Sequence, residues 1–253
     1  MKKAYITGAT GAIGMALVGE LLKNRISTTV FLRKDSGRND RVKDSFSGEL
    51  ARGLLRIEYV SLEELSGYAL SRNTQDMKTY ASQDLLTKAA GGADTAVFYH
   101  LGWSGTFGEQ RNDADMQQKN VEYTLDAVRL AKRLGCVHFI GVGSQAEYGR
   151  FDGRLTPATR TLPENEYGRA KLAAGIRSAE LCRGLGLRHS WVRVLSVYGP
   201  FDGRNTMIMS VIRGLLSGER VSLTKGEQIW NYLYSGDAAR ALLMLGASSL
   251  SVQ

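Results

Sequence analysis

The most constraining feature of the chain is a glycine-rich turn directly after an apolar N-terminal stretch. Residues 4–6 have the character of a short strand, and the helix-prone segment 15–23 follows the turn, which reads Thr7-Gly8-Ala9-Thr10-Gly11-Ala12-Ile13-Gly14. Strand, glycine turn and helix in this order open the βαβ unit that binds dinucleotides. The glycines permit a tight turn, close approach of backbone to a pyrophosphate and close helix packing, while the helix start favours phosphate charge. We therefore predict a nucleotide site at Gly8, Thr10, Gly11, Ala12, Ile13 and Gly14; an ordinary glycine-rich turn is the alternative.

Length and composition fit one large α/β domain better than two equal domains. The chain has 253 residues, and its 29 glycines and 3 prolines suit many tight turns between strands and helices. No apolar run approaches the roughly 20 residues needed to span a bilayer, and no apolar signal core follows Met1. We therefore expect a cytoplasmic protein with no membrane partner.

Charge and metal-binding residue types exclude several classes of function. The two cysteines and three histidines are scattered, which predicts no metal site and buried, reduced thiols. The formal net charge of +8 comes without a basic helix, zinc knuckle or aromatic-studded sheet motif. A surface that attracts small anionic ligands is the simpler interpretation, so we expect a small-molecule substrate and no nucleic acid.

Apolar segments alternate with helical patterns along most of the chain. Strands are predicted at residues 28–32, 54–60, 95–99, 137–142 and 189–194, with helices at 120–134 and 164–185. This alternation predicts a parallel, doubly wound sheet. Residues 66–82 form a long polar connection without an assigned role, and 83–90 are weakly helical. Beyond Pro200 we expect a small lid over the carboxyl edge of the sheet, built from a helix at 207–216, strands at 220–224 and 229–234, and a final helix at 237–245.

The end of the second strand bears on the choice of cofactor. In nicotinamide enzymes of this design, a carboxylate about 20 residues beyond the last glycine holds a ribose hydroxyl, whereas an arginine there accommodates a 2′-phosphate. Arg33 and Lys34 occupy this place, with Arg38, Arg41 and Lys43 close behind. These cations favour NADP over NAD. The alternative is that they are solvated loop charges and that Asp35 takes the ribose.

A second ligand-facing turn follows the fourth predicted strand. It reads His100-Leu101-Gly102-Trp103-Ser104-Gly105. Because open α/β sheets bind ligands at the carboxyl ends of their strands, this turn is expected to line the cofactor at His100, Leu101 and Gly102 and the substrate at Trp103 and Ser104.

Three further residues have the chemistry needed to move a proton during hydride transfer. Tyr167 and Lys171 are four residues apart in a predicted helix and so share a face, and Ser144 follows a predicted strand whose carboxyl end points to the same cleft. An unperturbed tyrosine, with a pKa of about 10, ionises too little at neutral pH. We expect the Lys171 ammonium to lower the pKa of Tyr167, and Ser144 to hydrogen-bond the reacting oxygen. A surface lysine beside a half-buried tyrosine is the alternative.

These motifs together resemble those of the extended short-chain dehydrogenases/reductases, the NAD-dependent epimerase/dehydratase group. The resemblance covers nearly the whole chain and is carried by the glycine turn, Asn120-Val121, Gly143-Ser144 with Tyr148-Gly149, Tyr167 with Lys171, and Arg193 with Val197-Tyr198-Gly199-Pro200. Gly226-Glu227-Gln228-Ile229 and Asn231-Tyr232 look most like the bacterial sugar-nucleotide 4-ketoreductases.

The resemblance implies a fold, an activity and a set of site residues. It implies a Rossmann domain at 1–196 and a short or incomplete substrate-binding region at 197–253, whose last strand and helix return to the Rossmann core. It implies an NAD(P)-dependent oxidoreductase or epimerase acting on a sugar-like carbonyl or carbinol, most often of a nucleotide-activated deoxysugar, and a homodimer paired through the helices near 120 and 164. Ser144, Tyr167 and Lys171 are the implied catalytic set, and further cofactor contacts are implied at Asn120, Lys171, Leu195 and Val197.

Departures from the family pattern qualify the substrate assignment. Dehydratases of the group have an Asp-Glu pair where this chain has Gln145-Ala146, which disfavours elimination of water. Many members have a diphosphate-binding arginine where Trp230 stands, and Arg204 is the candidate replacement. Gln145, Arg204 and Trp230 therefore complete the predicted substrate site. Two other functions stay open: a binding protein that senses NAD(P) without turnover, and a reductase of a non-sugar carbonyl on an apolar platform of Trp103 and Trp230.

Overall fold

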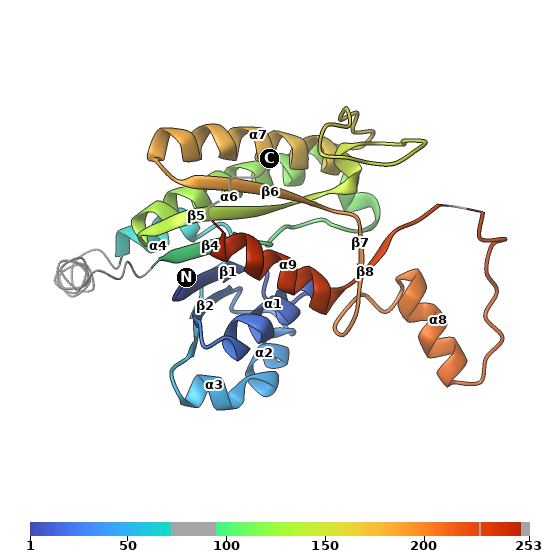
Figure 1. The fold of residues 1–253 in the computed structure, drawn as a ribbon, viewed down its shortest axis with the longest axis horizontal. Coiled ribbons are helices and arrows are strands. Elements are labelled where there is room, and N and C mark those ends of the chain that lie inside the picture. The colour runs from blue at the N-terminus through green and yellow to red at the C-terminus, as the bar shows by residue number, and fades with distance from the viewer. Residues whose placement is uncertain (72–94, 228, 249–253) are drawn as a thin grey trace.

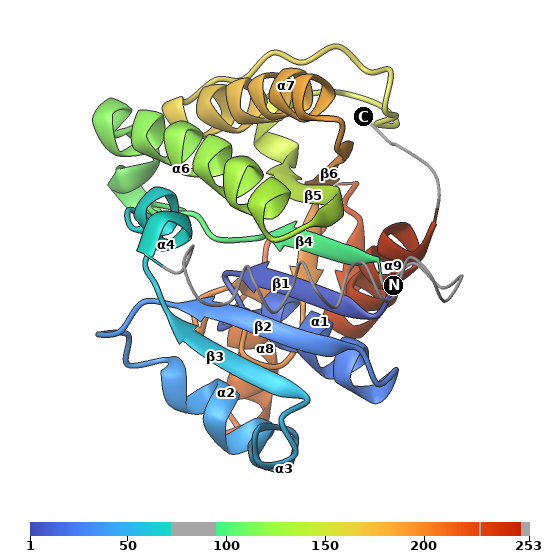
Figure 2. The same cartoon turned by 90° about the vertical axis from the view of Figure 1, so that its left-hand side faces the viewer.

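A parallel sheet forms the centre of the molecule. The computed structural model describes residues 1–71, 95–227 and 229–248. Its six strands lie in the order β3-β2-β1-β4-β5-β6, and each neighbouring pair is parallel (Figure 2). Their bounds are β1 (Lys3–Thr7), β2 (Ser27–Leu32), β3 (Leu55–Tyr59), β4 (Ala96–His100), β5 (Cys136–Ser144) and β6 (Arg188–Val194).

The direction of strand addition reverses at β1. From β1 the chain first adds β2 and β3 on one side, then returns to add β4, β5 and β6 on the other. Thr7 at the carboxyl end of β1 is in register with Phe31 of β2 and His100 of β4. Such a reversal opens a crevice at the carboxyl ends of the strands, so the turns after β1 and β4 face the same space.

Helices cover both faces of the sheet (Figure 1). One face carries α1 (Ala12–Lys23), α2 (Asn39–Ser45), α3 (Ser47–Ala51) and α9 (Ser235–Ala247), and the other carries α4 (Leu65–Ser71), α6 (Ala114–Arg133) and α7 (Glu166–Leu185). Two single-turn 3₁₀ helices, η1 (Gly108–Asn112) and η2 (Gln145–Glu147), precede α6 and α7. Among the described residues no helix is long and apolar enough to cross a membrane.

The core is divided into two layers by the pleat of the strands. Ile6 and Val30 point toward α1 and α9, whereas Tyr5, Phe98 and Phe139 pack beneath α6. The rings of Tyr5, Phe98 and Phe139 stack across three strands with centroid separations of 6.4 and 5.9 Å. Both faces of the sheet are therefore buried, as expected for parallel strands connected by helices.

Helix boundaries follow from local caps. The Asp113 side chain accepts a hydrogen bond from the Met116 amide at the start of α6, and Asn165 does the same for Gly168 at the start of α7. Gly186 ends α7 in the left-handed conformation, with φ of +66°. These caps place the first turn of α7, which contains Tyr167, next to η2.

The segment after β6 leaves the sheet and then returns. The short strand β7 (Ser196–Tyr198) pairs in parallel with β8 (Tyr232–Tyr234), and α8 (Met207–Leu216) between them has no buried residue and stands apart from the sheet (Figure 1). The final helix α9 packs against α1.

The fold class predicted from the sequence is confirmed, and so are the predicted core strands. The strand expected at 220–224 is wrong, because this segment has no regular structure, and the one at 229–234 is reduced to Tyr232–Tyr234. Helix α6 begins at Ala114, earlier than expected, because Asp113 caps it. The strand β7 and the helices α2, α3 and α4 were not predicted; α4 contains residues 66–71 of the expected polar connection 66–82, and the rest of that connection lies outside the described residues. The weakly helical segment 83–90 lies outside the described residues.

Candidate active site

The glycine turn leaves room for a phosphate at one of its three glycines. Gly8 has φ of +74°, and a Cβ there would lie 2.6 Å from the Gly102 nitrogen. A Cβ at Gly14 would overlap the Gly8 carbonyl oxygen, whereas at Gly11 the nearest atom would be 3.9 Å away. Gly11 precedes α1, whose first amides receive no hydrogen bond from a side-chain cap. Close packing thus explains why Gly8 and Gly14 are glycines. The open space at Gly11, beside the uncapped amides of α1, fits a dinucleotide pyrophosphate.

Of the basic residues that follow β2, Arg41 contacts the glycine turn, whereas Arg33 and Lys34 are exposed to solvent. Arg33 and Lys34 are exposed, and the Asn39 amide donates to both of their carbonyl oxygens, at 2.9 and 3.1 Å. Arg41 instead reaches the glycine turn, where its Nη1 donates to the Thr10 carbonyl at 3.3 Å and to the Phe201 carbonyl at 3.3 Å. Arg41 is therefore the cation that the structure brings to the glycine turn itself.

His100 anchors the turn after β4. Its Nδ1 lies 2.9 Å from Thr7 Oγ1, and its Nε2 lies 3.2 Å from Thr124 Oγ1. Burial, aided by the charge of Lys171, lowers the pKa of His100 to about 3, so the ring is neutral. The Leu101 amide donates to the Thr7 carbonyl at 3.1 Å and the Gly102 amide to Thr7 Oγ1 at 3.2 Å, so Thr7 holds the start of this turn against β1.

The next residues are held by two polar side chains on α6. Trp103 Nε1 donates to Gln117 Oε1 at 2.8 Å, and the Ser104 amide donates to Asn120 Oδ1 at 2.8 Å. Asn120 Nδ2 returns a hydrogen bond to the Ser104 carbonyl at 2.9 Å. The buried Asn120 side chain thus fixes the Trp103–Ser104 segment. Gln117 was not singled out from the sequence, although its three-residue spacing from Asn120 places both amides on one helix face.

Ser144, Tyr167 and Lys171 come together at the carboxyl end of β5. The Ser144 hydroxyl lies close enough to the Tyr167 phenol to lower its pKa, and it accepts a hydrogen bond from the Ala146 amide at 3.2 Å. Lys171 Nζ lies 5.9 Å from the centroid of the Tyr167 ring and donates to the Val142 carbonyl at 2.7 Å. The Ser144 hydroxyl, the Tyr167 phenol and the Lys171 amine therefore form one partly buried cluster. Such a cluster is suited to exchanging a proton with a ligand oxygen.

The environment shifts the pKa values of both titratable members of this set. Burial raises the pKa of Tyr167, and the Ser144 hydrogen bond followed by the charge of Arg111 act in the opposite direction. Burial lowers the pKa of Lys171 to about 7, against the opposing charge of Glu147. Arg111 is a cation that lowers the pKa of Tyr167 and that the sequence did not indicate, whereas the expected effect of Lys171 on Tyr167 stays a prediction.

Glu147 is a buried carboxylate that the sequence reasoning missed. Its side chain is fully buried and accepts from the Ser144 amide at 2.8 Å, from Trp191 Nε1 at 3.1 Å and from Arg193 Nε at 2.7 Å. The signal was present in the sequence, since a serine followed three residues later by glutamate is a capping-box pattern. Glu147 therefore fixes the backbone of Ser144 against β6.

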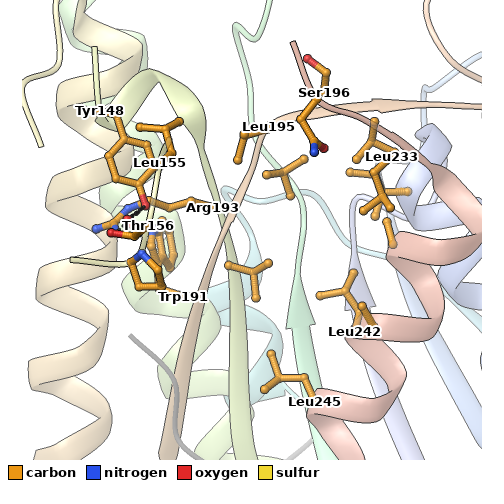
Figure 3. Close-up of a pocket in the computed structure, with 18 residues that line it drawn as sticks. Tyr148, Leu155, Thr156, Trp191, Arg193, Leu195, Ser196, Leu233, Leu242 and Leu245 are labelled. Atoms are coloured by element: carbon orange, nitrogen blue, oxygen red, sulfur yellow. Dashed lines mark hydrogen bonds between the residues drawn. The ribbon is translucent and has the colours of Figure 1, made fainter. Parts of the chain in front are cut away.

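A separate cavity of about 540 Å³ lies along β6 (Figure 3). Its walls include Ile13 of the glycine turn, the predicted cofactor residues Leu195 and Val197, and Leu242 of α9. Arg193 also lines it, and its Nη1 donates to the Tyr148 hydroxyl at 3.3 Å. The cavity thus borders the glycine turn at Ile13, but Ser144, Tyr167 and Lys171 are not among its lining residues.

The remaining predicted substrate residues are placed differently. Gln145 directly follows Ser144 in η2. Trp230 donates from its Nε1 to Ser196 Oγ, beside β7, and Arg204 is exposed. Within the described residues neither Trp230 nor Arg204 forms a hydrogen bond or ion pair with the Ser144–Tyr167–Lys171 set. The same residues contain no group of three or more histidine, cysteine, aspartate or glutamate side chains that could hold a metal ion.

Comparisons with known proteins agree with this fold. A family model described as the NAD dependent epimerase/dehydratase family matches residues 4–251. No curated protein matches the chain. A similar solved structure is a UDP-glucuronic acid 4-epimerase from Bacillus cereus in complex with NAD, with a TM-score of 0.75, 19% identity and coverage of 98% of this chain and 74% of that one.

Two further solved structures share the fold with similar TM-scores and sequence identities. A UDP-N-acetylglucosamine 4-epimerase from Methanobrevibacter ruminantium has a TM-score of 0.77 and 20% identity, covering 99% of this chain and 74% of its own. A dTDP-glucose 4,6-dehydratase from Bacillus anthracis in complex with NAD has a TM-score of 0.73 and 16% identity, covering 100% of this chain and 74% of its own.

Proposed function

Because the chain belongs to the NAD dependent epimerase/dehydratase family, we propose that it is an NAD(P)-dependent reductase or epimerase of a nucleotide-activated sugar. The observation that carries the proposal is that the Ser144 hydroxyl, the Tyr167 phenol and the Lys171 amine meet at the carboxyl end of β5, with Lys171 one helical turn beyond Tyr167 on α7. The similar structures bind nucleotide sugars: one holds UDP-N-acetylmuramic acid, and another holds UDP-glucose together with NAD.

Tyr167 is the proposed acid and base. A bound nicotinamide supplies or accepts a hydride at the carbon that carries the reacting oxygen. For electrons and atoms to balance, the oxygen must gain or lose one proton at the same time, and the Tyr167 phenol is placed to exchange it. Ser144 would donate a hydrogen bond to that oxygen.

Lys171 is proposed to contact the cofactor as well as the catalytic set. Its Nζ is buried between the Val142 carbonyl and the face of Trp103, 3.7 Å from that ring. Because its pKa lies near 7, it can gain or release a proton at neutral pH at little cost. Further cofactor contacts are proposed for the glycine turn, for the backbone of residues 100–102 and for Leu195 and Val197.

The cofactor preference is proposed to be NADP, with NAD as the other choice. Arg41 is half-buried at the glycine turn, and Arg33 and Lys34 are exposed close by at the end of β2. A 2′-phosphate would be attracted by these cations, whereas a ribose hydroxyl needs only an acceptor such as Asp35.

The substrate region is proposed to comprise residues 197–253, beside a dinucleotide-binding domain at 1–196. Trp103, Ser104 and Gln145 would face the sugar, and Arg204 and Trp230 would approach its nucleotide. Elimination of water is disfavoured, because Gln145-Ala146 offers no carboxylic acid or base next to Ser144. A homodimer formed through α6 and α7, and a cytoplasmic location, stay predictions.

Mass spectrometry of the ligands that co-purify with the protein is the most informative test. Retention of NADP or NAD, with turnover of one member of a panel of keto and hydroxy nucleotide sugars, is the expected result. The variant Tyr167→Phe should lose turnover while keeping its affinity for the cofactor. Activity that survives in Tyr167→Phe would show that another group is the acid and base, and cofactor binding without turnover on any of the panel would favour a sensor.

A further inference from the structure

The Tyr167 ring is enclosed by one side chain from each of two segments that precede α6. The guanidinium carbon of Arg111, in η1, lies 4.5 Å from the centroid of the phenol ring, and Trp103 meets the same ring edge-on at 6.1 Å. A guanidinium at this distance is close enough to interact directly with the ring face. Arg111 is therefore part of the immediate surroundings of Tyr167.

The charge of Arg111 is not neutralised by a carboxylate in the described part of the chain. Other arginines near the site are paired: Arg193 with Glu147 at 2.7 Å, Arg177 with Glu122 at 2.8 Å, and Arg169 with Glu166 at 2.5 Å. No such ion pair includes Arg111, which is half-buried. A half-buried cation beside a titratable phenol, without a salt-bridge partner, favours negative charge on that phenol.

Lys171 is less well placed than Arg111 to stabilise a negative charge on the Tyr167 phenol. Its Nζ donates to the Val142 carbonyl at 2.7 Å and lies 3.7 Å from the Trp103 ring centroid, but 5.9 Å from that of Tyr167. Burial also weakens its charge at neutral pH, since it lowers the pKa of Lys171 to about 7. An arginine keeps its charge at every pH that the fold tolerates.

We propose that Arg111 is a positioning residue whose permanent charge stabilises the ionised phenol of Tyr167, a task that Lys171 alone does not fulfil. The inference rests on the proposed role of Tyr167 as acid and base. The balance of charges agrees with it: burial and the Glu147 carboxylate raise the pKa of Tyr167, and the Ser144 hydrogen bond and Arg111 lower it. The remaining charged neighbours on α7, Glu166 and Arg169, pair with each other.

Direct titration of Tyr167 tests the proposal without any substrate. The protein is labelled with 3-fluorotyrosine, whose phenol is more acidic, and the fluorine resonance of residue 167 is assigned as the one missing from Tyr167→Phe. Arg111→Gln should move the titration midpoint of this resonance to higher pH. Arg111→Lys should restore much of the shift, because it returns a cation to the same place. Circular dichroism at each pH verifies that the fold is kept.

Arg177→Gln is the matched control, because it removes a cation from a surface ion pair with Glu122. It should leave the Tyr167 midpoint unchanged. A midpoint that does not move in Arg111→Gln, or that moves equally in Arg177→Gln, overturns the inference. The proposed function is judged separately, because the titration requires no turnover.

A kinetic readout follows once a substrate is found. In the direction that uses Tyr167 as the base, Arg111→Gln should lower kcat at neutral pH and shift the acidic limb of its pH profile upward, with Arg111→Lys recovering part of both. An increase in KM with an unchanged pH profile would instead show that the guanidinium binds substrate, and would overturn the assigned role.

Discussion

At the scale of single residues, the geometry of the site depends on Glu147. Its carboxylate joins the Ser144 amide, the Trp191 indole and the Arg193 guanidinium, and none of its surface is exposed. Removal of one partner of a buried ion pair leaves the other desolvated and without compensation. The position of Ser144 is thus connected to the core of β6 through one side chain.

Replacement of Glu147 by alanine should therefore destabilise the protein strongly. We expect Glu147→Ala to lower the free energy of unfolding by about 3–5 kcal/mol, since it leaves the partly buried Arg193 guanidinium and the buried Trp191 indole without their acceptor. The control is Glu166→Ala, which breaks the surface pair with Arg169 and should cost about 0–1 kcal/mol. Urea unfolding of both variants provides the comparison, and equal costs would contradict the role given to Glu147.

Gly11 and Gly14 differ in what a methyl group would meet. Gly14→Ala should cost about 1–3 kcal/mol of stability, because its Cβ overlaps the Gly8 carbonyl. Gly11→Ala should leave the unfolding midpoint nearly unchanged and weaken NADPH binding, because its Cβ points to the side where the pyrophosphate would lie. Thermal unfolding and NADPH fluorescence titration separate the two effects. Unaltered NADPH affinity in Gly11→Ala would argue against this phosphate site.

The meeting of Ser144, Tyr167 and Lys171 at one edge of the sheet was predictable from the sequence, but the surroundings of these residues were not. Ser144, Tyr167 and Lys171 are indicated by chemistry, chain order and the rule that strand ends meet at one edge of a parallel sheet. Arg111 lies on a 3₁₀ turn with no local signal, and only tertiary packing brings it to Tyr167. Gln117 shares a helix face with Asn120, but its contact with Trp103 also depends on tertiary packing. Residues that act through neighbours distant in sequence leave little trace in a single sequence.

At the scale of elements, the adjacent strands β5 and β6 carry two buried histidines. His138 Nε2 lies 2.9 Å from Ser190 Oγ, and His189 Nε2 lies 2.9 Å from Ser178 Oγ. The Nδ1 atom of each ring is buried without a hydrogen-bond partner in the described residues. Burial lowers the pKa of both rings to about 4, so both are neutral in the folded protein at physiological pH.

This pair predicts a loss of stability in mild acid. The unfolded chain binds protons at these histidines near pH 6.5, whereas the folded chain binds them only near pH 4. Their contribution is complete above about pH 6.5 and is lost as the pH falls toward 4. Urea midpoints measured across this range should fall, and they should fall less steeply in His138→Gln. An identical slope in this variant would assign the acid sensitivity to other groups.

The success of strand prediction depended on burial. Strands β1 and β4 were recognisable because both of their faces are buried, which demands apolar residues, whereas the edge strand β3 was recognisable by the alternation of apolar and polar residues at 54–60. The pair β7 and β8 consists of three-residue strands stabilised by each other across a long stretch of chain, so neither has a strong local pattern. At 220–224 the alternating pattern predicted a strand that does not form. In the described part of the chain no strand lies beside this segment to pair with it.

At the scale of the whole molecule, the cofactor would add contacts between three segments that the sheet and Arg41 already connect. The glycine turn, the turn after β4 and the segment after β6 meet at its carboxyl edge. A ligand that binds only the folded state stabilises it by mass action, by about 2.7 kcal/mol at a concentration of 100 times its Kd.

NADPH should therefore stabilise the protein more than NADH at equal concentration. The expected difference arises from Arg41 at the glycine turn, so Arg41→Gln should reduce the NADPH effect and leave the NADH effect nearly unchanged. Thermal unfolding with each cofactor, for the wild type and this variant, tests the preference. Equal stabilisation by both cofactors in the wild type would remove the basis for proposing NADP.

The packing of α9 against α1 also determines when α1 can be buried during synthesis on the ribosome. Helix α1 is synthesised early, but part of its apolar surface waits for α9, which is translated long afterwards. A nascent chain would therefore expose that surface throughout most of its synthesis. The packing of α1 into the core is therefore completed only after α9 has been made.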